Sequence, residues 1–446
     1  MAKVNGTERV LTGWGRLSPS RAVVAAPADL TQLQEIIAAQ PARGVVARGA
    51  GRSYGDAATN GGGYVLTPVT SAHIEVDTAT PSVRVSASTT FAELLEHLVP
   101  QGLLLPVLPG TRHLTVGGAV AADVHGKNQR GDGTISAWID EIDLIDGDSK
   151  RCTLVPGTDG FRATVGGMGL TGVIIEVKLR LLRINSTALQ VTSRRLPDLD
   201  SLLSALESAT SRYAVAWIDS SGRHRSFGRG VLDTGDHLDR PDAADRDGLA
   251  YRAGPSPRAP ELPFCPFTPA TARAFNGLWY RTAARELTGT VSLARYFHRL
   301  DAVSQWNRAL GPRGFLQYQF MVPQDAEVII TEVLTALRRH HTAPFLGTLK
   351  RFGPASGNYL SFPGPGWSLA VDVPATNRGL WTVLDHLDRR VVDLGGRVYL
   401  AKDARVRAHR FANMYRELET WRAARRQLDP RGVFASDLGR RLGLCC

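Results

Sequence analysis

The sequence predicts an α+β fold divided into two domains. Short strand-like runs alternate with amphipathic helices over residues 5–184, and the pattern changes over 185–396. A chain of 446 residues is also too long for one ordinary compact core. With 43% hydrophobic and 21% charged residues, the composition is that of a folded globular protein.

The first region contains clear helix and strand signals. Thr90 and Glu93 form a capping box that starts a helix, and its apolar positions recur with helical spacing up to Leu98. Leu30, Leu33 and Ile37 predict a second helix. The Val/Ile/Leu patterns of residues 82–88 and 172–182 predict strands.

The second region predicts a strand over 314–322 and helices over 326–339 and 384–394. Farther on, apolar residues along one side predict a long helix over 405–427. Residues 223–263 are rich in Arg, Asp, Gly and Pro and show no sustained period. We therefore expect a mobile loop or lid there.

Residues 47–56 form a glycine- and arginine-rich turn after the apolar pair Val45-Val46. The turn holds three glycines and two arginines in ten residues. Glycine permits positive φ and close approach of the backbone to a ligand. Successive unpaired N–H groups in a turn suit an anion such as pyrophosphate. The spacing is neither that of the Walker loop nor that of the Rossmann motif.

Two more glycine clusters follow, at residues 108–128 and 163–172, each beside a strand-like run. Small residues over 117–122 would let the backbone lie flat against a large planar group. Three such segments in one region are hard to explain as independent turns. They predict one binding surface.

The order of these motifs resembles the vanillyl-alcohol-oxidase (PCMH-type) family of FAD-binding oxidases. The matches are R-G-x-G-x-S-Y-G-D, P-G-T-R-x-x-T-V-G-G, D-x-H-G-K-N and G-G-x-G-L-T-G, and further matches extend to residues 433–437. Within this family the chain is most similar to the branch that oxidises lipid-linked ribofuranose. The resemblance implies a discontinuous FAD-binding domain over 5–184 and 397–446. It also implies a substrate-binding domain over 185–396, built on an antiparallel sheet with flanking helices.

The resemblance implies that FAD contacts the glycine segments and two later residues. The predicted cofactor-binding residues are Ala47, Arg48, Gly49, Ala50, Gly51, Arg52, Ser53, Tyr54, Gly55, Asp56, Gly110, Thr115, Val116, Gly117, Gly118, Ala122, Asp123, Val124, His125, Val173 and Tyr399. Many relatives attach the flavin covalently through a histidine at the position of Arg52. Arginine cannot form that bond, so we predict non-covalent FAD. The four cysteines form no metal pattern, and no metal site is predicted.

The resemblance also assigns the predicted catalytic residues, Lys402 and His125. Lys402 would meet both the flavin and the sugar hydroxyl; the alternative is a surface pair with Asp403. The predicted substrate-binding residues are Lys127, Gln317, Gln319, Lys350 and Lys402. Gln317 and Gln319 alternate on a predicted strand and should face the same side.

Two positions depart from the family pattern. Ala370 stands where the mycobacterial sequences have cysteine, and Phe297 stands where tyrosine is expected. Thiol-trapping inhibitors could not attach at Ala370. The expected reaction is unaffected, but the exact sugar is open.

The expected activity is FAD-dependent oxidation of the 2′-hydroxyl of decaprenylphosphoryl-β-D-ribofuranose. This would be the first half of an epimerisation that supplies arabinose for cell-wall arabinan. An NAD(P)H-dependent short-chain reductase would complete it. The alternatives are an alditol or aldonolactone oxidase that uses oxygen, a paralogue that oxidises another ribofuranosyl compound, and a non-catalytic flavoprotein or nucleic-acid binder.

The formal net charge of +11 fits an anionic cofactor, a phosphorylated substrate and an anionic membrane surface; the alternative is a solvated basic surface with none of these partners. The arginines lack the interleaved aromatics of a nucleic-acid-binding face, so no nucleic acid is expected. No apolar run is long enough to span a bilayer, and the first residues lack the apolar core of a signal peptide. We expect a cytoplasmic protein, with peripheral association at the inner membrane as a hypothesis.

Overall fold

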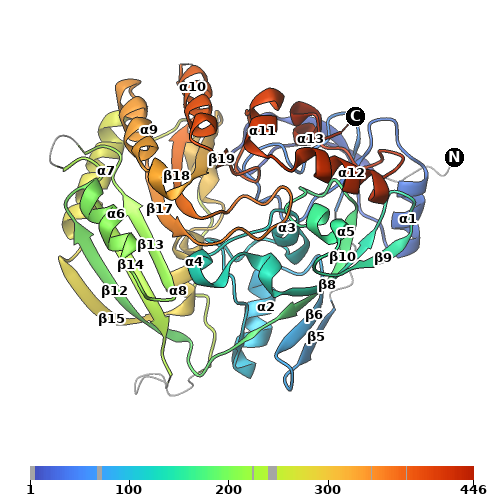
Figure 1. Ribbon diagram of the computed structural model, residues 1–446, viewed down its shortest axis with the longest axis horizontal. Helices are drawn as coiled ribbons and strands as arrows, with labels where there is room; N and C mark the ends of the chain where they lie inside the picture. Colours follow the sequence, from blue (N-terminus) through green and yellow to red (C-terminus); the bar gives the residue numbers. More distant parts are fainter. Residues whose placement is uncertain are drawn as a thin grey trace.

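The computed structural model describes residues 6–67, 73–222, 226–239, 249–342, 344–377 and 379–445. Sheets and helices are mixed throughout, so the predicted α+β class is confirmed. Two groups of sheets flank a central region that contains α3 (Figure 1).

The N-terminal half forms two sheets joined by short helices. The four-stranded sheet has the order β1-β2-β4-β3, with β1 (Thr7–Leu11), β2 (Ser20–Ala25), β3 (Val45–Ala47) and β4 (Tyr64–Leu66). The five-stranded antiparallel sheet has the order β5-β6-β10-β8-β9, with β5 (Ile74–Asp77), β6 (Ser82–Ser86), β8 (Ile139–Ile145), β9 (Arg151–Leu154) and β10 (Val173–Arg180). A short pair joins β7 (Leu103–Leu104) to β11 (Leu182–Arg183).

The helices of this half are α1 (Leu30–Ala38), α2 (Phe91–Leu98), α3 (Val116–Ala121), α4 (Gln129–Asp132) and α5 (Asp159–Thr164). The predicted capping box at the start of α2 is confirmed: Thr90 and Glu93 satisfy each other's backbone N–H groups. Leu33 and Ile37 of α1 are buried, as their spacing predicts.

The second half forms one eight-stranded antiparallel sheet with the order β15-β12-β14-β13-β17-β18-β16-β19. Its strands are β12 (Ala188–Leu196), β13 (Tyr213–Ile218), β14 (Gly230–His237), β15 (Glu286–Ser292), β16 (Phe315–Val322), β17 (Leu346–Phe352), β18 (Gly366–Pro374) and β19 (Arg397–Val398). The associated helices are α6 (Leu199–Glu207), α7 (Pro269–Thr282), α8 (Leu293–Phe297), α9 (Val328–Arg339) and α10 (Leu380–Asp393).

The expected loop over 223–263 is wrong for residues 230–237, which form β14 between β12 and β13. Its two glycines and two aspartates are typical of a loop, but pairing with β12 on one side and β13 on the other holds the segment extended. Residues 223–225 and 240–248 lie outside the described residues. The mobility of this segment stays a prediction.

The long helix expected over 405–427 is also wrong. The chain forms α11 (Ala408–Met414) and α12 (Leu418–Leu428), with a break at Tyr415. The Tyr415 side chain is buried, and its hydroxyl donates a hydrogen bond to the Val398 carbonyl at 2.8 Å. This tertiary contact outweighs the helical pattern.

The C-terminal helices lie beside the N-terminal sheets (Figure 1). Val45 of β3 bridges to Phe434, and the indole of Trp421 donates to the Ala163 carbonyl of α5 at 2.9 Å. By contrast, Arg397–Val398 pairs with β16 of the eight-stranded sheet. Chain segments far apart in sequence therefore meet around one central region.

Candidate active site

A cavity of about 800 Å³ separates the glycine segments from one face of the eight-stranded sheet. All three predicted glycine clusters contribute to its lining, the third through Met168, Gly169 and Gly172. The predicted catalytic and substrate-binding residues all line it as well. The two faces of this cavity are called the glycine wall and the sheet wall below.

The glycine wall is assembled by close packing between the first two clusters. A Cβ atom on Gly49 would lie 2.1 Å from Oγ1 of Thr115, so only glycine fits there. Thr115 caps α3, its Oγ1 accepting from the Gly118 N–H at 3.2 Å. Within the described chain, the backbone N–H groups of residues 49–53 donate no hydrogen bond to a protein acceptor. Such a run of free donors suits a bound anion.

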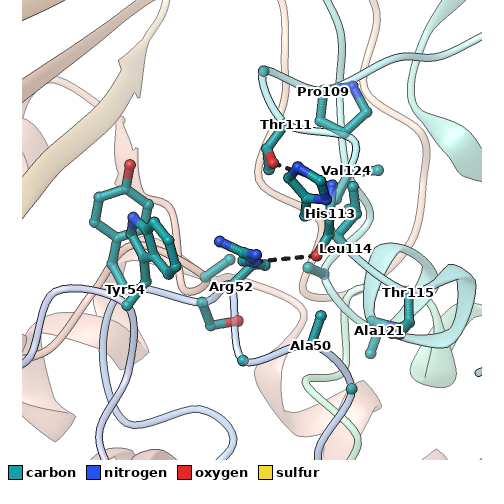
Figure 2. A pocket seen from close by; sticks show the side chains of 18 of the residues that line it. Ala50, Arg52, Tyr54, Pro109, Thr111, His113, Leu114, Thr115, Ala121 and Val124 are labelled. Carbon is teal, nitrogen blue, oxygen red and sulfur yellow. Dashed lines mark hydrogen bonds between the residues drawn. The ribbon is translucent and has the colours of Figure 1, made fainter. Parts of the chain in front are cut away.

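The two arginines of the turn are fixed by backbone carbonyls. Arg48 donates to Thr12 at 2.8 Å and to Ala58 at 3.0 Å. The Arg52 guanidinium lies 4.2 Å from the ring centroid of Trp14, and its Nε donates to the His113 carbonyl at 3.1 Å. Figure 2 shows Arg52 between Tyr54 and the 109–115 segment. Burial lowers the pKa of both arginines, yet the ordinary pKa is so high that both stay charged.

Four predicted cofactor contacts lie behind the cavity lining: Gly55, Asp56, Val116 and Asp123. Gly55 packs against the Asp403 backbone, and Val116 is fully buried. Asp56 forms an ion pair with Arg441 at 2.7 Å. Asp123 accepts a hydrogen bond from Ser361 at 2.6 Å. These four residues therefore support the glycine wall from behind and do not line the cavity themselves.

The sheet wall presents polar side chains from β16, β17 and β18. Gln317 and Gln319 both line the cavity, which confirms that they face one side of their strand. Lys350 of β17 is partly buried, donates to the Gly126 carbonyl at 3.2 Å, and has its pKa lowered by burial to about 8. Ala370 of β18 lines the cavity beside Gln319 in the paired strand.

Lys402 enters the cavity from the segment that follows β19. Its Nζ lies 3.8 Å from the centroid of the Tyr54 ring. Burial lowers the pKa of Lys402 to about 8; Lys350 adds to this effect, and Asp372 opposes it. Asp403 points elsewhere, into an ion pair with Arg441 at 2.8 Å. The alternative of a surface Lys402–Asp403 pair is therefore wrong.

Asp372 is a buried acidic residue that the sequence analysis missed. Its Oδ2 accepts from Gln317 at 2.8 Å, and its Oδ1 has no hydrogen-bond partner in the described part of the protein. Burial raises the pKa of Asp372 to about 7, although the Gln317 hydrogen bond and Lys402 oppose the shift. A carboxylate inside the apolar run of β18 is the signal that could have revealed it.

His125 lies buried among aromatic rings, with Phe352 at 5.0 Å and Tyr399 at 5.2 Å between centroids. Its Nε2 lies 3.2 Å from the Gln319 side-chain nitrogen, and its Nδ1 has no partner among the described residues. Burial, with Lys350 and Lys402 nearby, holds the pKa of His125 well below its usual value. The ring is therefore neutral at pH 7.

Lys127 lies over the Tyr296 ring, 3.8 Å from its centroid, and donates to the Tyr296 carbonyl. Burial and the charge of Arg299 lower the pKa of Lys127 to about 7, against the influence of Asp233. Phe297, at the position where tyrosine was expected, lines the cavity beside it. Trp217 also lines the cavity.

The residues present fit FAD. The free N–H groups of the 49–53 turn suit a pyrophosphate. A Cβ on Gly110 or Gly169 would meet nothing within 4 Å, so the backbone there faces open space that can receive a ligand. Tyr399 and Val173 line the same space.

Comparisons with known proteins agree with this arrangement. The FAD binding domain family matches residues 21–155, and the D-arabinono-1,4-lactone oxidase family matches residues 382–442. Decaprenylphosphoryl-beta-D-ribose oxidase from Mycolicibacterium smegmatis is 37% identical over 98% of this chain and 98% of its own length. An uncharacterized protein of Streptomyces coelicolor is 38% identical over 80% of this chain and 100% of its own. Alditol oxidase from a Streptomyces species is 30% identical, over 38% of this chain and 41% of its own.

Proposed function

The chain belongs to the decaprenylphosphoryl-β-D-ribose oxidase family of FAD-dependent oxidoreductases, and from this we propose its substrate and the roles of its residues. The proposed substrate is a polyprenyl-phosphoryl ribofuranose, decaprenylphosphoryl-β-D-ribofuranose in the first instance. Its 2′-hydroxyl is oxidised to a ketone. The observation that carries this proposal is a set of three partly buried lysines that line one cavity: Lys127 from the second glycine cluster, Lys350 from the sheet wall and Lys402 from the segment after β19.

Oxidation of an alcohol removes a hydride from carbon and a proton from oxygen. FAD, when bound, accepts the hydride and so supplies the redox step. In our proposal Lys402 accepts the proton, because its pKa of about 8 leaves part of the amine neutral near pH 7. Asp372, buried beside Gln317 on the same face of the sheet, acts through Lys402 and Gln317 as a positioning residue.

The remaining polar groups would orient the sugar and its phosphate. Gln317 and Gln319 offer amide groups to the sugar hydroxyls. Lys127 and Lys350 attract the phosphate, and the neutral His125 contacts the flavin or the sugar without adding charge.

We also propose that FAD is held without a covalent bond. Arg52 occupies the position of the histidyl link, and its guanidinium stacks on Trp14. Precipitation with acid should release the yellow chromophore into the supernatant. Chromophore retained on the washed protein pellet would contradict this proposal.

The two-domain division stays part of the proposal: the glycine wall and Lys402 lie in the FAD-binding domain, and strands β16, β17 and β18 of the sheet wall lie in the substrate-binding domain. The ketone product requires a hydride donor to complete epimerisation. An NAD(P)H-dependent short-chain reductase is the proposed partner for that step.

An alditol or aldonolactone oxidase is the second candidate. The match of residues 382–442 to the D-arabinono-1,4-lactone oxidase family favours it, since this segment contains Lys402. The likeness to alditol oxidase covers a smaller part of both chains than the likeness to the ribose oxidase.

Anaerobic titration of the purified yellow protein separates the two candidates. Lipid-linked ribofuranose should bleach the flavin and yield a 2′-keto sugar, whereas xylitol, sorbitol and arabinonolactone should not. Bleaching by the polyols or the lactone, with none by the lipid-linked sugar, would favour the second candidate and overturn the first.

A further inference from the structure

We propose that α7 is a docking surface for an anionic lipid bilayer, placed at the mouth of the cavity. The surface consists of the exposed apolar residues Phe275, Leu278 and Trp279 together with the arginines Arg273 and Arg281. The placement of the substrate's lipid chain rests on the proposed function. The affinity of α7 for a bilayer does not.

Helix α7 exposes its large apolar side chains and buries small or polar ones, the opposite of a usual surface helix. It buries Ala272, Asn276 and Gly277, which are small or polar. It exposes its three large apolar side chains, with 46% of Phe275, 63% of Leu278 and 45% of Trp279 accessible. A soluble helix normally turns such residues toward the core. An exposed apolar face of this kind marks an interaction surface.

The buried face is firmly anchored, so the exposed face is a stable feature. Asn276 of the buried face donates to the Pro344 carbonyl at 3.4 Å, and the half-exposed Trp279 ring also contacts the Trp217 ring edge-to-face at 6.5 Å. Pro269 at the start and the capping pair of Thr268 and Thr271 fix the first turn. The helix lies at the periphery of the molecule in Figure 1.

The exposed face is continuous with the cavity. Phe275 and Trp279 line the cavity while remaining almost half exposed. Leu300 and Val303 do the same, with 42% and 43% of their surface accessible. The mouth of the cavity therefore carries an apolar rim, across which a hydrocarbon chain could pass from a membrane without crossing water.

The charge of this segment complements an anionic surface. Arg273, Arg281 and Arg285 are exposed, and the sequence from 269 to 285 contains no Asp or Glu. Arginines beside exposed Trp, Phe and Leu are typical of helices that lie in the membrane interface. Each basic residue near an anionic leaflet adds attraction. These features favour a bilayer over a second protein, because the only charged side chains on α7 beside its exposed apolar face are basic.

Co-sedimentation with vesicles tests the proposal on the full-length, FAD-loaded protein. Vesicles of phosphatidylcholine with one-third phosphatidylglycerol should bind the wild type more strongly than vesicles of phosphatidylcholine alone. The variant Leu278→Glu should lower the partition coefficient roughly tenfold, because one apolar anchor is lost. The double variant Arg273→Glu/Arg281→Glu should lower it about thirtyfold or more.

A matched control is Arg389→Glu/Arg426→Glu, which makes the same charge change at exposed positions of α10 and α12. It should bind vesicles more strongly than the α7 double variant. Equal loss in both double variants, or no loss with Leu278→Glu, would overturn the proposal. So would a wild-type dimer in gel filtration that Leu278→Glu converts to a monomer, without any binding to vesicles.

Vesicle binding is measured without a substrate, so it is independent of the proposed reaction. Binding through α7 with no flavin reduction by lipid-linked ribofuranose would remove only the proposed function. Flavin reduction by that substrate without vesicle binding would remove only the docking surface.

Discussion

The glycine wall and the sheet wall of the cavity differ in what they present to a ligand. The glycine wall offers backbone N–H groups, and its arginines are held by carbonyls or by an aromatic ring. The sheet wall and the segment after β19 offer partly buried ionisable side chains with shifted pKa values, Lys350 and Lys402, with the buried Asp372 bonded to Gln317 on the same face of the sheet. Backbone donors hold an anion without titrating. Side chains near neutrality can move a proton. Anion binding and proton transfer therefore fall to different parts of the cavity.

The largest effect is expected from Lys402→Ala. Loss of the proposed base should lower turnover about a thousandfold, within the range typical of general-base removal. FAD should remain bound, because the glycine wall is unchanged. Steady-state kinetics and the flavin absorbance of the purified protein measure the two quantities. The control Lys150→Ala alters a solvent-exposed lysine and should have wild-type turnover. Near-normal turnover of Lys402→Ala would break the assignment.

Gly49→Val should weaken the binding of FAD, which Lys402→Ala leaves intact. Its side chain would collide with Oγ1 of Thr115, 2.1 Å from the ideal Cβ position, and force the first two clusters apart. Affinity for FAD should fall roughly thirtyfold, the cost of forcing extra atoms into a packed site. Flavin content and equilibrium dialysis measure this. Gly131→Ala, whose Cβ meets nothing within 4 Å, is the control. A fully flavinated Gly49→Val protein would show that this contact is dispensable.

Asp372→Asn should shift the pH dependence of kcat. The Asp372 carboxylate raises the pKa of Lys402, so removing its charge should lower that pKa further. The rise of kcat with pH should then move to lower pH by roughly one unit. A merely structural role would reduce kcat at every pH and leave the profile in place. An unmoved inflection in a folded, flavin-loaded variant would contradict the coupling.

Arg441→Met should affect turnover least and stability most clearly. Arg441 ties the glycine wall to the segment that carries Lys402, since it pairs with Asp56 behind the glycine wall and with Asp403 beside Lys402. Leaving Asp403 buried without this partner should cost about 3 kcal/mol of unfolding free energy. Thermal unfolding measures the loss, and the exposed Arg426→Met is the control. Equal melting temperatures would show that the tie is not required.

The ion pair between Asp403 and Arg441 predicts that the stability of the folded protein depends on pH. Burial opposes ionisation of Asp403, but Arg441 and Arg405 outweigh it and hold its pKa below the usual value. A lowered folded-state pKa contributes stability above the unfolded pKa and loses it as the pH falls. Wild-type stability should therefore drop on acidification below about pH 4, and the drop should be smaller in Arg441→Met.

Local patterns predicted the parts of this molecule that local forces determine. The capping box of α2, the buried stripe of α1 and the shared side of Gln317 and Gln319 are all confirmed. Residue spacing alone could not predict β14, because long-range pairing holds its Gly- and Asp-rich sequence extended. The break at Tyr415 likewise depends on a contact with Val398.

The motifs were enough to predict which residues line the candidate site. They were not enough to predict which charged groups are buried beside one another there. Motif order grouped Lys402, His125 and the glycine turns, which do line one cavity. Asp372 was missed because its importance comes from burial beside Gln317 and Lys402, which only the folded sheet brings about. Asp56 belongs to the same motif as the lining residues, yet it does not line the cavity, and its buried side chain instead forms an ion pair with Arg441.

The pH dependence of flavin reduction in a single anaerobic turnover tests most directly whether proton transfer falls to Lys402. Rapid mixing of the FAD-loaded protein with lipid-linked ribofuranose gives the rate from the loss of flavin absorbance. The rate should rise from pH 6 to pH 9 with an inflection near the Lys402 pKa of about 8, and the rise should vanish in Lys402→Ala. A wild-type rate that stays constant over this range, or an unchanged rise in Lys402→Ala, would contradict the account.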